Sequence, residues 1–221
     1  MDEVLCKLPG RREINRQGRR ESILEVAGES FLTKGYAGTS MSAIAAALGG
    51  SKGTLWSYFP SKEALFEAVL DHATAAFRER LSSLLDPCSD LVSTLERFAQ
   101  SFIEKVTSPE AIALQRLIQG EAGRSPEVGE IFYQRAPRRT QLLLADFLSG
   151  AMDRGALRRD DALQAARVFT ALCVSGSHQQ MMLGLLTDPT SEQLAEDVAR
   201  TLDIFLRAYA PGSVDPRSQV A

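Results

Sequence analysis

The sequence predicts an all-α protein, with a small N-terminal group of three helices and a larger helical region after it. Apolar residues recur at helical spacing in most segments, and no stretch alternates β-branched and polar residues as a strand does. Serine, proline and an acid stand together at two expected helix starts, an order typical of N-termini. With 221 residues, 44% of them apolar, the chain is long enough to bury a sizeable core.

The first expected helix covers residues 19–34, because Ile23, Ala27 and Phe31 fall on one stripe and a glycine follows. The preceding residues, 1–18, contain three arginines and few apolar side chains, a composition typical of a flexible basic arm. We therefore expect ordered structure to begin near residue 19.

Two short helices joined by glycines are expected next. The first covers residues 40–48, where apolar residues recur at i, i+3, i+4 and i+7, and Thr39 or Ser40 can cap its start. The two glycines at 49–50 supply the backbone freedom of a sharp turn. Ser51 can cap the second helix, which the next proline closes.

The remaining helices are longer. Ser-Pro-acid sequences mark starts at Ser108 and Ser125, and Pro137 should kink or interrupt the second of these segments. We expect helices over residues 61–85, from 91, from 108, over 125–154, over 161–186 and over 191–209. The predicted domains are a basic arm at 1–18, a small helical domain at 19–65, a larger helical domain at 66–210, and a disordered tail at 211–221.

Two short helices with a tight turn between them can place the second helix in a DNA groove. In that second helix, Lys52 can reach a guanine edge or a phosphate, and the methyl group of Thr54 suits a thymine methyl. Leu55 and Phe59 are better explained as core. The candidate DNA contacts are small, polar, basic and aromatic residues: Thr39, Ser40, Ser42, Ala43, Ser51, Lys52, Gly53, Thr54, Trp56, Ser57, Tyr58 and Lys62.

Charge is divided along the chain in a way that agrees with DNA binding. Residues 1–62 contain nine Lys or Arg and six Asp or Glu, whereas the remainder contains sixteen and twenty-two. A local basic surface attracts nucleic acid even when the whole protein is acidic. An ordinary solvated surface explains the same distribution, and for the arm both DNA contact and no function stay open.

The segment GYAGTSMSAIAAALGGSKGTLWSYFPSKEALFEAVL resembles the N-terminal DNA-binding domain of the TetR family of transcriptional regulators, with the likeness covering residues 19–70. Three positions depart from the family pattern: Gly50 replaces a branched apolar residue, Trp56 a tyrosine, and Ser57 a larger polar residue. The resemblance implies a dimer on a palindromic double-stranded DNA operator, and a phosphate contact from Lys62.

The C-terminal part more loosely resembles AcrR-like or AefR-like regulators, through SPEVGEIFYQRAPRR and ALCVSGSHQQMMLGL. This likeness implies a small lipophilic effector in a mostly apolar cavity with few fixed charges. The expected lining residues are Phe98, Phe102, Leu114, Gln115, Ile118, Gln119, Phe132, Phe147 and Phe169, several of which ordinary core packing also explains. We expect the homodimer to form through the last two helices, unless their apolar stripes are used inside the protomer.

Other functional classes find little support. His72 and His178 stand on separate expected helices without a nearby ligand partner, and no phosphate loop occurs, so we expect no catalytic site, metal or cofactor. The cysteines are three and far apart. No apolar run is long enough to cross a bilayer and no secretory signal is present, which predicts a cytoplasmic protein without a membrane partner.

We interpret the chain as a DNA-binding transcriptional regulator, most simply a repressor that a lipophilic effector releases from its operator. A helical DNA-binding regulator without an effector, and a transcriptional activator, are the alternatives. Effector binding would act by selecting a dimer shape that no longer matches the operator.

Overall fold

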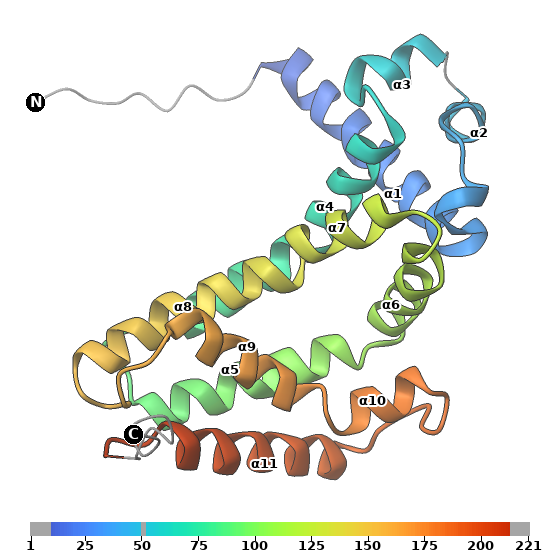
Figure 1. Ribbon diagram of the computed structural model, residues 1–221. Helices are drawn as coiled ribbons and strands as arrows, with labels where there is room; N and C mark the ends of the chain where they lie inside the picture. The colour runs from blue at the N-terminus through green and yellow to red at the C-terminus, as the bar shows by residue number, and fades with distance from the viewer. Residues whose placement is uncertain (1–9, 50–51, 213–221) are drawn as a thin grey trace, which may run out of the picture.

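The computed structural model describes residues 10–49 and 52–212, and this part of the chain is folded into helices without a strand (Figure 1). The all-α prediction is confirmed. The N-terminal helices are α1 (Arg11–Gly38), α2 (Met41–Ala47), α3 (Lys52–Tyr58) and α4 (Lys62–Leu84). They are followed by α5 (Leu91–Val106), α6 (Pro109–Ala122), α7 (Pro126–Arg135), α8 (Pro137–Asp153), α9 (Ala162–Cys173), α10 (Ser177–Met182) and α11 (Ser191–Tyr209).

Local sequence signals set several helix ends as expected. Ser61 and Ser108 each cap a helix by accepting a hydrogen bond from the backbone N–H three residues later. Thr190 and Gln193 form a reciprocal capping box at the start of α11. Pro137 ends one helix and begins the next, because its ring cannot continue the helix that precedes it.

Two expectations about helix ends were wrong. Helix α1 begins at Arg11, so residues 11–18 are helical rather than a flexible arm, while residues 1–9 lie outside the described part. The helix expected over 161–186 ends at Cys173 and is followed by the short α10. At this break the Asp197 carboxylate of α11 accepts a hydrogen bond of 2.8 Å from the Ser177 N–H.

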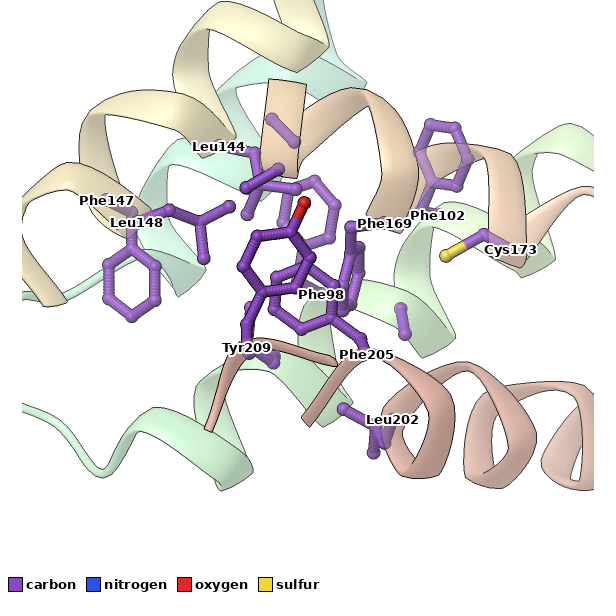
Figure 2. Packing of buried hydrophobic residues seen from close by; sticks show 14 of the residues in the cluster. Phe98, Phe102, Leu144, Phe147, Leu148, Phe169, Cys173, Leu202, Phe205 and Tyr209 are labelled. Carbon is purple, nitrogen blue, oxygen red and sulfur yellow. The ribbon is translucent and has the colours of Figure 1, made fainter. Parts of the chain in front are cut away.

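The larger core lies between α5, α8, α9 and α11, and Figure 2 shows its centre. The ring of Phe169 meets Phe98 and Phe205 edge to face, with ring centroids 6.0 Å and 4.9 Å away. The apolar stripe of α11, which includes Leu202 and Phe205, is buried in this core. The stripe is therefore used inside the protomer.

The second core joins the N-terminal helices to the larger region. Phe31 of α1 and Phe66 of α4 are fully buried, and their ring centroids lie 5.0 Å apart. Ile118 of α6 and Ile131 of α7 pack into the same cluster. The helix-turn-helix is thus anchored on α6 and α7 as well as on its own helices. Across the described residues no helix is both long and apolar enough for a membrane span.

Candidate functional site

Helices α2 and α3 stand at one end of the molecule and present an outer face to solvent (Figure 1). Ile44 of α2 and Leu55 of α3 are buried on the inner side. Six expected DNA contacts lie on the exposed side of these two helices or at their start: Ser40, Ser42, Ala43, Gly53, Trp56 and Ser57. Thr54 and Tyr58 are half-buried beside them. Trp56 is 41% exposed, which is unusual for so large an apolar ring.

Thr39, one of the expected DNA contacts, has a structural role instead. Thr39 is 2% exposed, and its hydroxyl lies 2.8 Å from the Gly35 carbonyl oxygen and 3.0 Å from that of Ser30. The prediction of a DNA contact from the Thr39 side chain is therefore wrong. Ser51 lies outside the described residues, and so does the side chain of Lys52 at the start of α3.

The ammonium group of Lys62 holds the link between α1 and α2. Its Nζ donates hydrogen bonds to the carbonyl oxygens of Tyr36 (2.8 Å) and Thr39 (3.1 Å). It also lies 4.0 Å from the centroid of the Tyr36 ring, in a cation–π contact. Because two of the three ammonium hydrogens are used inside the protein, the phosphate contact expected of Lys62 has one N–H left.

Burial raises the pKa of Tyr36 above its ordinary range, and the nearby carboxylate of Glu63 adds to the effect. The Tyr36 hydroxyl donates a hydrogen bond of 3.3 Å to that carboxylate. The pKa of Glu63 is lowered by hydrogen bonds, first from Ser61 and then from its own backbone N–H. The hydroxyl therefore remains protonated at neutral pH and keeps the end of α1 joined to the start of α4.

The first three turns of α1 place arginines beside α3. The Arg16 guanidinium lies 5.9 Å from the centroid of Tyr58, and that of Arg20 lies 5.5 Å from Phe59. Arg19 donates a hydrogen bond of 3.4 Å to the Leu48 carbonyl oxygen. Residues 11–20 contain five arginines and a single glutamate. They therefore add positive charge to the end of the molecule that carries α3. The sequence predicted a helix for Arg19 and Arg20 but not for the arginines that precede them.

A cavity of about 430 Å³ lies between α1 and helices α4 to α9. Four residues expected to line it do so: Phe102, Leu114, Gln115 and Phe132. The other five do not. Phe98, Phe147 and Phe169 are buried in the larger core, Ile118 is buried in the second core, and Gln119 is exposed to solvent. Helical spacing identifies a buried residue but not which side of the core it faces.

One wall of the cavity is formed by α1 and α4, the helices on which the helix-turn-helix packs. Phe31 and Leu32 of α1 line it, together with Phe66 and Leu70 of α4. Sequence reasoning missed these four residues, because their spacing is that of ordinary core. Three of them, Phe31, Phe66 and Leu70, also belong to the second core. A molecule in the cavity would thus touch the framework that holds α2 and α3.

Polar groups enter the cavity at a few points. Gln115 lies 2.9 Å from Nε2 of His178, a buried histidine of α10 whose pKa is lowered by burial. Gln141 also lines the cavity, and its buried Oε1 has no hydrogen-bond partner among the described residues. Arg78, Lys105, Arg167 and Glu110 complete the charged lining. The rest of the lining is mostly apolar.

Ion pairs connect α4 to α7 and α8 beside the cavity. Arg135 of α7 lies 2.6 Å from Glu67 and 3.2 Å from Asp71, and Arg139 of α8 lies 2.7 Å from Asp71. All four side chains are about one-third exposed, so solvent screens the pairs. They fix orientation more than they add stability.

Comparison with protein families assigns both parts of the chain. Residues 23–69 match the model described as bacterial regulatory proteins, tetR family. Residues 93–211 match the model of the AefR-like transcriptional repressor, C-terminal domain.

Individual relatives agree. The chain is 28% identical over 192 residues to the HTH-type transcriptional regulator UidR of Escherichia coli K12, covering 83% of this chain and 87% of that protein. Among solved structures, the Flavonoid-responsive Regulator FrrA is 34% identical, with a TM-score of 0.75 over 89% of this chain and all of that one. A regulator from Mesorhizobium loti MAFF303099 has the same TM-score at 25% identity, covering 88% and 98% of the two chains.

Proposed function

Since the chain belongs to the TetR family, it is a DNA-binding transcriptional regulator, and we propose that it is a repressor that a small lipophilic molecule releases from its operator. The observation that carries the proposal is that residues of α1 and α4, the helices that hold the helix-turn-helix, also line the cavity. The match to a repressor C-terminal domain supports repression over activation.

The release mechanism follows from the position of α4. This helix starts at the helix-turn-helix, contributes Phe66 to the second core, and runs along the cavity as far as Arg78. A ligand that fits the cavity better when α1 and α4 are displaced stabilises that displaced shape. It lowers DNA affinity only by its preference for one shape over the other.

The effector we propose is an aromatic phenol of the flavonoid kind. FrrA, similar over most of its length, is described as flavonoid-responsive. Aromatic rings line the cavity from several sides, including Phe77, Phe102 and Phe132. A ligand hydroxyl could donate to the buried Oε1 of Gln141, which otherwise lacks a partner among the described residues. The cavity volume of about 430 Å³ falls in the usual range for small-molecule sites.

The family acts on DNA operators as dimers, and we place the dimer surface on α9, α10 and α11. The buried stripe of α11 cannot form this surface, because Leu202 is 9% exposed and packs inside the protomer. The outer side of the same helices keeps apolar groups in solvent. Ile204 is 44% exposed, and Leu183 and Leu185, which follow α10, are 69% and 75% exposed. Such groups are typical of protein interfaces.

The DNA surface we propose consists of the outer face of α2, the exposed residues of α3 and the basic start of α1. Arg12 and Arg16 are exposed on α1, on the stretch that runs beside α3. They are suited to phosphates next to the groove that α3 enters, because arginine binds phosphate through several N–H donors. Lys52 and Trp56 would act within that groove.

Replacing Lys52 with alanine should lower affinity for the preferred site by about tenfold or more and relax base preference at one position, because a good base contact discriminates by about 1–3 kcal/mol. Replacing Arg97 with alanine is the charge-matched control, since Arg97 is an exposed residue of α5, a helix that lies away from α3 (Figure 1). Binding to a randomised site library measures both effects.

The same experiment tests the dimer. The preferred site should be an inverted repeat, and sedimentation of the complex should give two chains per site. If Lys52→Ala binds every site as the unaltered protein does, α3 is not the reading helix. A complex with one chain on a non-repeated site would overturn the dimer model.

Replacing Ala111 with tryptophan should fill part of the cavity and raise the flavonoid concentration needed to release DNA by about tenfold or more, since overpacking a site costs about 1–3 kcal/mol. Affinity for DNA without ligand should stay nearly unchanged. Ala113→Trp is the matched control, because Ala113 lies on the exposed side of the same helix and does not line the cavity. Fluorescence anisotropy of labelled operator, titrated with naringenin and with dyes and fatty acids, measures release. Equal response of both variants would place the ligand elsewhere.

A further inference from the structure

Basic side chains outnumber acidic ones in the lining of the cavity. Arg78 of α4, Lys105 of α5 and Arg167 of α9 contribute three positive charges, and Glu110 of α6 contributes the single negative one. The rest of the lining is predominantly apolar. Arg78 and Lys105 are only partly exposed, whereas Arg167 is exposed to solvent.

The partners of Arg78 leave most of its donors unused. Its Nη1 donates a hydrogen bond of 2.6 Å to the Thr74 hydroxyl and lies 3.7 Å from the Asp71 carboxylate. That carboxylate already binds Arg139 at 2.7 Å and Arg135 at 3.2 Å. A guanidinium carries five N–H donors, and Asp71 shared among three arginines cannot satisfy those of Arg78.

The other two cations have no acidic partner among the described residues. Within residues 10–49 and 52–212, no salt bridge includes Lys105 or Arg167. Both side chains line the cavity, as Arg78 does. The cavity therefore offers an apolar space together with two cations that have no acidic partner among the described residues, and a third, Arg78, most of whose N–H donors are unused.

From this we infer that the effector is an organic anion, with an aromatic or aliphatic body against the apolar walls and one carboxylate or ionised phenol bound by Arg78. The inference rests on the proposed effector function and narrows its ligand class. Arg78 is the anchor because its side chain is only 26% exposed and because its guanidinium matches the geometry of a carboxylate. Lys105 and Arg167 add positive potential around the same acidic group.

Matched ligand pairs test the charge requirement on the full-length protein. Biphenyl-4-carboxylate is compared with biphenyl-4-methanol, and 2-naphthoate with 2-naphthalenemethanol, by calorimetry near neutral pH. Each pair shares its apolar body and differs in the acidic group. We expect the acid of each pair to bind about tenfold more tightly than the alcohol. A charge-assisted hydrogen bond contributes more free energy than a neutral one, and the difference corresponds to about that factor in affinity.

Variants of one helix then identify the anchor. Arg78→Gln should remove most of the preference for the acid and leave binding of the alcohol unchanged, whereas Arg78→Lys should retain part of it. Arg80→Gln is the matched control, because Arg80 lies two residues away on α4, is exposed and does not line the cavity. A melting curve of each variant confirms that it is folded.

The outcomes separate this inference from the proposal beneath it. If the alcohols bind as tightly as the acids, or if Arg78→Gln keeps the preference while folded, the anionic effector is overturned and the cavity remains a ligand site. If neither acids, alcohols nor flavonoids bind, the effector function fails and the inference fails with it.

Discussion

Replacing Phe66 with alanine should lower the free energy of unfolding by about 3–5 kcal/mol, the usual cost of removing a large aromatic side chain from a core. Phe66 is fully buried, and its ring meets Phe31 at 5.0 Å and Tyr36 at 5.2 Å between centroids. It also borders the cavity, so the space left behind joins an existing hollow instead of closing. Operator binding should be largely lost, because α1 and α4 are no longer held together.

Trp56→Ala is the comparison that gives this result its meaning. Trp56 is large and aromatic but exposed, so its removal should leave the unfolding curve nearly unchanged while weakening DNA binding. Chemical denaturation and operator titration of both variants separate loss of framework from loss of contact. A Phe66→Ala protein as stable as the unaltered one would show that the second core does not hold the helix-turn-helix.

Replacing Gly35 with alanine should lower the free energy of unfolding by about 1–3 kcal/mol for the backbone alone. Gly35 has φ 76° and ψ 168°, a region that is almost confined to glycine. An added Cβ would also lie 2.6 Å from Oε1 of Glu121, closer than real contacts allow. This glutamate accepts a hydrogen bond of 3.4 Å from the Ala37 N–H. The substitution should therefore weaken the contact between α6 and the end of α1.

A second substitution separates the two causes. Glu121→Ala in the Gly35→Ala background removes the steric contact but not the backbone strain, so stability should recover in part. Gly120→Ala is the control, since a Cβ there meets nothing within 4 Å and alanine favours a helix. It should be neutral or slightly stabilising. Full recovery in the double variant would mean that the backbone at Gly35 is not strained.

The helix ends that sequence reasoning predicted are those controlled by neighbours in the chain. Ser61, Ser108 and Thr190 each cap a helix through an atom three residues away, so the signal lies within one turn. The break after Cys173 has a different origin. It involves a contact between Ser177 and Asp197, which lie twenty residues apart, and no local pattern announces such a contact.

The candidate site divides in the same way. The exposed face of α2 and α3 follows from helical spacing, because the apolar positions define the opposite, buried side. Membership of the cavity does not follow, as Phe98 and Phe102 show: both rings are buried and stack at 6.1 Å, yet only Phe102 lines the cavity. The structural contacts of Thr39 and Lys62 could not be predicted, because their partners include backbone carbonyls, which carry no sequence signal.

The shared wall of the cavity limits how such a regulator can be redesigned as a biosensor. Positions on α5, α6 and α8 line the cavity and do not belong to the second core, as with Phe102, Ala111 and Thr140. They can be varied to accept a new compound at little cost to operator recognition. Phe31 and Phe66 both line the cavity and belong to the second core. Many variants in a library that includes them would therefore be lost because they do not fold, whatever their response to the compound. A screen restricted to the former set should yield more responsive sensors than a screen of the whole lining.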